Sequence, residues 1–188
     1  MQAVGEIAQA FLTSTRPDEV YRLALQRITP LVGASFGCVF LRDGAEELLH
    51  IVAAESWPEE YEKYLSDMRV RVGLGPTGRA VAENSIVEVA DVFSDPSLED
   101  WWDPARELGF TASVSLPLAF HERVVGALTL YFVRPDSVTG MDRPLLRLVA
   151  SQLAATAEKA HLIDDLQRAN QRLREQNVDL EARYREAE

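Results

Sequence analysis

The sequence predicts an α+β protein that combines an antiparallel β-sheet with helices and ends in one long helix. The sheet is predicted by two strand-like pairs, residues 35–41 with 47–54 and residues 111–119 with 123–133, each joined by a short turn. The long helix is predicted by residues 139–188, which contain neither glycine nor proline after Pro144. A helix over that stretch would have on the order of 45 residues and a length of about 70 Å.

Two helices are expected before the first strand. Residues 1–13 place apolar side chains at helical spacing, among them Val4, Ile7 and Phe11. Thr15 is followed three residues later by Asp18, with Pro17 in the first turn, which predicts the start of a second helix. We expect this second helix to end near Pro30.

The middle of the chain contains a G-x-G-x-x-G pattern formed by Gly73, Gly75 and Gly78. Such a pattern also occurs in dinucleotide-binding turns. However, residues 68–72 alternate between apolar and basic, whereas a Rossmann strand is buried on both faces. Pro76 lacks an N–H that a phosphate would need. The pattern therefore indicates a structural turn into a helix beginning at Thr77 and Arg79, with anion binding at the helix N-terminus as a secondary alternative.

Shorter elements surround this turn. Residues 59–66 predict a short helix, and residues 68–72 and 86–89 predict short strands. Residues 91–108 form an acidic and aromatic segment for which we expect irregular structure. Segments of this length inside a compact domain are often functional.

The second strand pair offers a candidate wall for a binding site. Strand alternation places Ser113 and Ser115 on one face and Val114, Leu116 and Leu118 on the other. A buried hydroxyl needs a hydrogen-bonding partner, and a ligand can supply one. The alternative is that the two serines bond neighbouring backbone groups.

The C-terminal helix changes character along its length. Its first half is amphipathic and should cover the sheet or pack against residues 1–12 through Leu145, Leu148, Val149, Leu153 and Ala157. Its second half has a seven-residue repeat, with leucine at heptad position d and asparagine twice at position a, over Ile163, Leu166, Asn170, Leu173, Asn177 and Leu180. Asparagine at position a favours a parallel two-stranded coil. We expect a homodimer formed by these residues together with Val4, Ile7 and Phe11; the alternative is one solvated helix.

Composition argues against several classes of function. The formal net charge of −11, without a dense Lys/Arg cluster, opposes nucleic-acid binding. No apolar run approaches the ~18 residues of a membrane span, and no signal-peptide pattern is present, so we expect a cytoplasmic chain with no direct membrane span. The single cysteine, Cys38, cannot form an internal disulfide.

Catalytic and metal-binding patterns are also missing from the sequence. No nucleophile–base pair and no metal-ligand spacing occurs, so we expect a non-enzymatic chain without catalytic residues or a metal site. The three histidines, His50, His121 and His161, are interpreted as structural or exposed. A haem ligand, with His50 as the candidate, is the less favoured alternative, and the identity of any cofactor stays unknown.

Several segments, in a fixed order, carry a family resemblance. They are residues 20–34 with the first strand pair, 72–81, 89–96, 113–118 with 123–130, and 141–160. In their order and spacing they resemble a GAF domain, a ligand-sensing module common in bacterial signalling proteins such as sensor histidine kinases. The resemblance covers about four-fifths of the chain.

The resemblance implies a sheet with helices packed on one face and a small-molecule pocket on the other, beneath residues 91–104. It also implies coupling from the pocket through terminal helices to an output domain, which we expect in a longer parent protein. The chain is accordingly divided into an N-terminal helix of the dimer bundle (1–13), a GAF-like sensory domain (14–158) and a coiled-coil signalling helix (159–188).

Three specialised branches of this family are not matched. The chain lacks the Asn-Lys-Phe-Asp-Glu series of cyclic-nucleotide-binding relatives. Cys38 lies in the wrong place to anchor a bilin. One cysteine cannot supply the pair on which methionine-sulfoxide-reducing relatives depend.

The expected ligand-binding residues come from the lid segments, the turn after the glycines and the serine strand: Trp57, Tyr61, Tyr64, Thr77, Arg79, Asp91, Phe93, Trp101, Trp102, Ser113 and Ser115. Acidic residues near the tryptophans favour a cationic or aromatic ligand. The alternative is a solvated acidic loop whose tryptophans pack on the domain.

The function predicted from the sequence is a non-catalytic sensory module that binds a small ligand and signals through a dimeric coiled coil. Its main alternative is a purely structural dimerisation module with no ligand. A structure without a cavity under residues 57–64 and 91–104 would favour that alternative.

Overall fold

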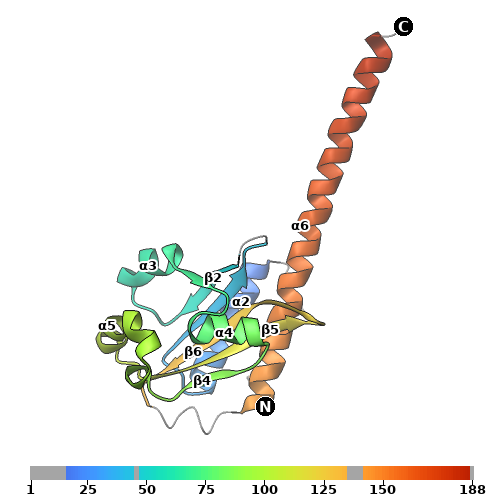
Figure 1. Cartoon of the computed structure of the whole chain (residues 1–188). Helices are drawn as coiled ribbons and strands as arrows, with labels where there is room; N and C mark the ends of the chain where they lie inside the picture. The colour runs from blue at the N-terminus through green and yellow to red at the C-terminus, as the bar shows by residue number, and fades with distance from the viewer. Residues whose placement is uncertain (1–15, 45–46, 135–141, 187–188) are drawn as a thin grey trace.

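The computed structural model describes residues 16–44, 47–134 and 142–186 (Figure 1). In chain order the elements are α2 (Pro17–Leu31), β1 (Phe36–Arg42), β2 (Leu48–Glu55), η1 (Glu59–Tyr61), α3 (Glu62–Asp67), β3 (Arg69–Arg71), α4 (Gly75–Glu83), β4 (Val87–Val89), η2 (Val92–Ser94), η3 (Pro96–Leu98), α5 (Glu99–Leu108), β5 (Ala112–Phe120), β6 (Arg123–Phe132) and α6 (Arg143–Glu186). The predicted helix with Val4, Ile7 and Phe11, and the predicted cap at Thr15, lie outside the described residues.

The six strands form one antiparallel sheet in the order β3-β2-β1-β6-β5-β4. Both predicted strand pairs are confirmed, because β1 pairs with β2 and β5 pairs with β6. The second pair turns at His121, whose φ of 53° places it in the left-handed region typical of tight turns. The first and last strands, β1 and β6, pair at the centre of the sheet.

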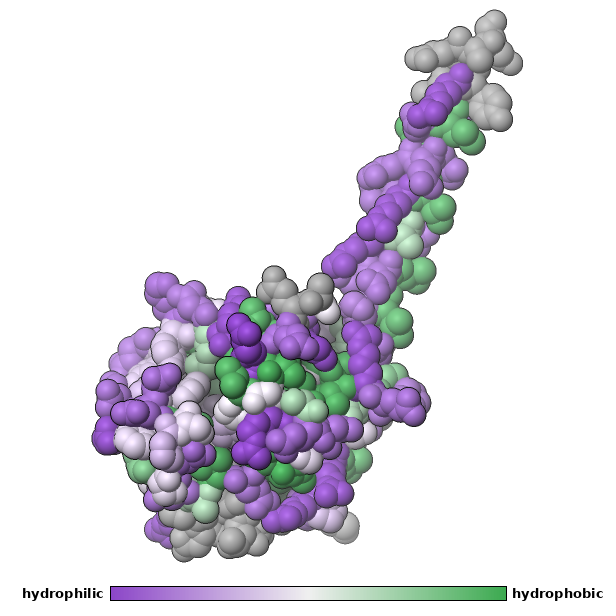
Figure 2. Space-filling view, viewed as in Figure 1, coloured by the Kyte–Doolittle hydropathy of each residue, from purple (hydrophilic) through white to green (hydrophobic). Residues whose placement is uncertain are grey.

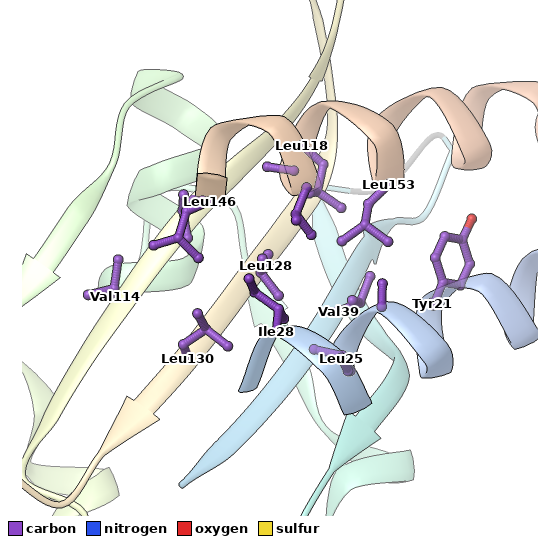
Figure 3. Packing of buried hydrophobic residues seen from close by; sticks show 14 of the residues in the cluster. Tyr21, Leu25, Ile28, Val39, Val114, Leu118, Leu128, Leu130, Leu146 and Leu153 are labelled. Atoms are coloured by element: carbon purple, nitrogen blue, oxygen red, sulfur yellow. The ribbon is translucent and has the colours of Figure 1, made fainter. Parts of the chain in front are cut away.

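Helices α2 and α6 cover one face of this sheet (Figure 3). Leu25 and Ile28 of α2 and Leu146 and Leu153 of α6 are fully buried against the sheet. The strands contribute the predicted apolar face of β5, together with residues of β1 and β6: Val39, Val114, Leu116, Leu118, Leu128 and Leu130. Because both helices present an apolar stripe to the same sheet face, this cluster is the main core of the domain.

The other face carries the short helices α3, α4 and α5 over a second apolar cluster. Here the structure corrects one expectation: residues 99–108 are helical rather than irregular. The acidic residues Glu99 and Asp100 stand in its first turn, and Gly109 ends it in the left-handed conformation. Pro104 lies inside the helix and removes one backbone donor.

Helix α6 confirms the predicted long helix and extends beyond the sheet (Figure 1). In its first half, Leu146 is buried against the sheet while Leu148 is 51% exposed, and the alternative packing of this stripe on residues 1–12 lies outside the described residues. All residues from 161 to 181 are exposed, including Ile163, Leu166, Leu173 and Leu180. No helix within the described ranges is long and apolar enough to cross a membrane.

Candidate functional site

A cavity of about 890 Å³ lies on the sheet face opposite α2 and α6. Its floor includes Ser113 of β5 with Thr129 and Tyr131 of β6. Its sides come from α3 and β3, from the first turn of α4, and from η3 and α5. The cavity thus lies where the resemblance placed a pocket, and its volume is within the ~300–1,000 Å³ range of small-molecule sites.

The glycine pattern builds one side of this cavity. Gly73 and Gly75 have φ values of 89° and 61°, which residues other than glycine rarely adopt. A Cβ on Gly78 would lie 2.2 Å from the Arg71 carbonyl oxygen, so only glycine lets α4 pack this closely on β3. The expected structural turn is confirmed, although α4 begins at Gly75, with Pro76 in its first turn, rather than at Thr77.

Aromatic contacts join α3 and α5 across the cavity. The Tyr64 and Trp101 rings, both lining the cavity, meet edge to face with centroids 6.3 Å apart. Beside them, the Tyr61 hydroxyl donates a hydrogen bond to Glu107 at 2.6 Å. This bond to a carboxylate raises the pKa of Tyr61 to about 12, so the phenol keeps its proton at neutral pH. The two segments therefore form a connected lid.

Three buried hydroxyls form a cluster behind the cavity. Thr77 of α4 lies 2.9 Å from Thr129, which lies 3.0 Å from Ser115, and Thr77 and Ser115 are 3.4 Å apart. Thr77 and Thr129 also line the cavity, whereas Ser115 lies behind them. The cluster thus ties the start of α4 to β5 and β6. Ser115 therefore bonds other side chains, and not only neighbouring backbone groups as in the alternative.

Replacing Thr129 by valine should remove the hydroxyl at the centre of this cluster. Thr77 and Ser115 would keep only their 3.4 Å contact. We expect urea denaturation to report a loss of about 1–3 kcal/mol in the free energy of unfolding. The control is Thr156→Val, which removes a hydroxyl bonded to the Gln152 carbonyl on an exposed part of α6 and should cost about 0.5 kcal/mol or less. Equal effects of the two changes would contradict a structural role for the cluster.

The structure brings only some of the predicted ligand-binding residues to the cavity. Four line it: Tyr64, Thr77, Trp101 and Ser113. The other seven contact other parts of the domain. Trp57 packs against Phe36 and Tyr131, Asp91 accepts a hydrogen bond from the Phe93 amide, and Arg79 pairs with Glu83.

Tyr61 and Ser115 have the partners described above, and Trp102 and Phe93 also have partners in the domain. Trp102 donates its indole N–H to the Val92 carbonyl at 2.8 Å. The Arg106 guanidinium lies over the rings of Phe93 and Trp102. For these tryptophan and phenylalanine side chains, packing on the domain describes the structure better than a role as a cavity lid.

Sequence reasoning missed most of the cavity's basic and apolar lining. The missed residues include Lys63, Met68, Arg69, Arg71, Leu98, Phe110, Thr129 and Tyr131. The alternation of β3 had placed Arg69 and Arg71 on one solvated side, and both are exposed in the structure. Thr129 could have been found from the pairing of β5 with β6. However, an irregularity at Leu118/Ala119 shifts the register that the turn alone would give.

The cysteine and the candidate haem ligand do not face this cavity. Cys38 is fully buried in β1, and burial raises the pKa of its thiol. On β2, Leu49 and Ile51 pack in the cluster on the cavity side, so His50 between them projects toward α2. No group of three metal-ligating side chains occurs in the described part of the chain. The structure therefore offers no support for haem at His50.

Comparisons with known proteins identify the family and the fold. The family model for the GAF domain matches residues 14–158. No curated protein matches the chain. The GAF domain of an Acinetobacter phosphoenolpyruvate-protein phosphotransferase has a similar structure, with a TM-score of 0.73 and 13% identity, covering 87% of this chain and 96% of that one.

Two further solved structures are similar in fold. The GAF domain of A. aeolicus nlh2 in an inactive state has a TM-score of 0.68 at 16% identity, covering 85% of this chain and 95% of that one. Free methionine-R-sulfoxide reductase from Neisseria meningitidis, with its substrate, has a TM-score of 0.66 at 17% identity, covering 86% and 89%. At such identities the likeness concerns the fold alone.

Proposed function

The chain belongs to the GAF domain family, whose members are generally sensory or regulatory ligand-binding modules, and on that premise we propose that it senses a small ligand without catalysis. In this proposal the ligand binds in the cavity between the sheet and the lid formed by α3 and α5. Its presence is transmitted through a homodimeric coiled coil of α6 to an output domain, such as a histidine kinase.

The observation that carries this proposal is the cavity itself. About 890 Å³ of open cavity lies between aromatic walls and a floor that includes buried hydroxyls. Apolar walls with a few convergent polar groups are typical of small-molecule sites.

Strand β5 supports a route from the cavity to the long helix. Ser113 faces the cavity, and its neighbour Val114 packs in the core beneath α2 and α6. Because α6 packs on β5, a shift of β5 on ligand binding would also displace α6. Such coupling requires that the ligand bind more tightly with one arrangement of α6 than with the other.

The exposed part of α6 supports the dimer. Its apolar side chains line one side of the projecting helix in Figure 2, and the set comprises Leu162, Ile163, Leu166, Leu173, Val178 and Leu180. Each is 47–68% exposed in the single chain. Side chains of this kind lose an unfavourable contact with water when two helices pair.

The non-catalytic nature of the module is supported by the chemistry of the cavity. The lining residues include no cysteine or histidine within the described part of the chain. The reductase among the similar structures is named for a reaction, but in this chain Cys38 lies buried in β1, away from the lining residues.

Native mass spectrometry of the purified chain tests the proposal. After incubation with a small-molecule extract of bacterial cells, we expect a dimer that carries an added small mass. Ser113→Leu, which fills the cavity floor, should abolish the added mass. Ser85→Leu, an exposed change outside the cavity lining, should retain it.

Two results would contradict the proposal. One is the absence of any added mass on the wild-type chain, which would favour the purely structural alternative. The other is an added mass that persists in a folded Ser113→Leu variant, since the ligand would then bind elsewhere. Thermal unfolding of each variant checks that it is folded.

A further inference from the structure

The charged residues that line the cavity lie at its mouth. They are Lys63, Asp67, Arg69, Arg71 and Asp100, and each of them is exposed to solvent. Lys63 and Asp67 also form an ion pair with each other. Because exposed charges are screened by water and salt, these residues contribute little to the electrostatics of the cavity interior.

Strand β3 directs its two arginines away from the cavity. Val70 packs in the apolar cluster on the cavity side of the sheet, so its neighbours Arg69 and Arg71 project to the other side. The strand register agrees, because Arg69 is paired with His50, which projects toward α2. Strand β3 thus offers the cavity an apolar side chain and no cation.

The buried part of the lining has no charged side chain among the described residues. Its members are apolar, as Val92, Leu98 and Phe110 are, or carry a hydroxyl, as Thr129 and Tyr131 do. Moving an ion into such surroundings without a counter-ion is strongly unfavourable, whereas an uncharged apolar body is stabilised there. The interior of the cavity therefore favours an uncharged ligand.

Tyr131 of β6 presents a hydrogen-bond donor to this interior. Its side chain lines the cavity and is 6% exposed, and its hydroxyl makes no hydrogen bond to any residue that the structure describes. Burial raises the pKa of this phenol well above its ordinary value, so the hydroxyl keeps its proton. Thr77 and Thr129, by contrast, already bond each other at 2.9 Å. A ligand atom that accepts a hydrogen bond is thus the partner that Tyr131 lacks.

Aromatic rings hold Tyr131 in place and enclose the space beside it. The Tyr131 ring lies between those of Trp57 and Phe110, with centroid separations of 5.4 and 5.0 Å. Tyr64 and Trp101 line the cavity from the side of α3 and α5. Aromatic rings pack favourably against one another in edge-to-face and offset arrangements. The walls therefore suit a ligand with an aromatic body.

We infer that the cavity binds an uncharged ligand with an aromatic body and a hydrogen-bond acceptor, such as a carbonyl oxygen. The acceptor receives the hydrogen bond of the Tyr131 hydroxyl, and the body lies among Tyr64, Trp101 and Phe110. The inference rests on the proposed function. It keeps the aromatic ligand expected from the sequence and excludes the cationic one.

The test uses four probes that share a naphthalene ring and differ in one substituent. 2-Acetylnaphthalene is uncharged and has a carbonyl acceptor, 2-ethylnaphthalene is uncharged without an acceptor, 2-naphthoate is an anion, and 2-naphthylmethylammonium is a cation. Isothermal titration calorimetry measures the affinity of each probe for the wild-type chain, for Tyr131→Phe, and for Ser113→Leu, which fills the cavity floor.

Tyr21→Phe is the matched control. Tyr21 is also buried, at 3% exposed, and its hydroxyl also has no partner in the described part of the chain. It lies in the main core between α2 and α6, on the sheet face opposite the cavity (Figure 3). The control therefore removes a comparable hydroxyl without touching the proposed site.

We expect the wild-type chain to bind 2-acetylnaphthalene most tightly and each charged probe at least about tenfold more weakly. Tyr131→Phe should weaken the ketone by about fivefold, the effect of one neutral hydrogen bond, and 2-ethylnaphthalene by less than about twofold. Tyr21→Phe should change neither affinity. Because Tyr131→Phe keeps the aromatic ring, its thermal unfolding should stay close to that of the wild type.

The other outcomes separate the inference from the proposed function. A charged probe that binds as tightly as the ketone overturns the uncharged class, and an unchanged ketone affinity in Tyr131→Phe overturns the hydrogen bond. In both cases, affinity that is lost in Ser113→Leu leaves the ligand-binding function standing. If no probe binds, or if Ser113→Leu binds them as tightly as the wild type, the inference fails. The proposed function then depends on the added mass in native mass spectrometry alone.

Discussion

Replacing Gly126 by alanine is expected to prevent stable folding of the domain. A Cβ at this position would lie 2.0 Å from the carbonyl oxygen and 3.0 Å from the carbonyl carbon of Phe40, which are backbone atoms of β1. Strand β6 cannot move away, because Gly126 is also paired on its other side with Leu118 of β5. The clash must therefore break strand pairing, at a cost of about 3 kcal/mol or more in the free energy of unfolding.

Urea denaturation followed by circular dichroism measures this loss, if the variant folds at all. Gly44→Ala is the matched control, since a Cβ there would have no atom within 4 Å. We expect the control to stay within about 0.5 kcal/mol of the wild type. An unchanged denaturation midpoint for Gly126→Ala would be incompatible with the pairing of β1 with β6 at this point.

The change Leu173→Asp in α6 is expected to convert the dimer into a monomer. Leu173 occupies heptad position d and is 57% exposed in the single chain, so the substitution should cost the monomer little. In a parallel coiled coil, two aspartates would face each other in the apolar seam. The combined loss of apolar contact and burial of like charges should weaken dimerisation by at least about a hundredfold.

Sedimentation equilibrium over a range of concentrations reports the dissociation constant. Gln171→Asp is the control, because it adds the same charge to the same helix at heptad position b, outside the seam. It should leave the dimer intact. A wild-type chain that is monomeric at high micromolar concentration, or a Leu173→Asp variant that still dimerises, would refute the coiled coil.

Much of the fold could be predicted because its signals are local. Period-two alternation identified β1, β2, β5 and β6, and the absence of glycine and proline after Pro144 predicted the length of α6. Helix α5 was missed because two signals conflict there. Pro104 argues for irregular structure, whereas the acidic first turn and Gly109 favour a helix, and packing of Ala105 and Leu98 in the apolar cluster decides between them.

The cavity was harder to predict than the fold because it depends on contacts between distant segments. Tyr64, Trp101, Thr77 and Ser113 were predicted as ligand-binding residues and line the cavity, but that the edge strand β3 also borders it depends on where β3 lies relative to α4. Of the acidic residues close in sequence to the tryptophans, Asp100 lines the cavity. Asp95 accepts a hydrogen bond from Ser97, and Asp103 forms an ion pair with Arg106. Neither aspartate lines the cavity.

The part of α6 beyond the domain has a mechanical consequence. Residues 159–186 extend about 42 Å at 1.5 Å per residue, with their base fixed against the sheet. For a straight rod of that length, a tilt of about 3° at the base displaces the far end by about 2 Å. A shift of β5 that is too small to disturb the core can therefore tilt α6 slightly. That tilt moves the C-terminal end of α6 far enough to change side-chain contacts there.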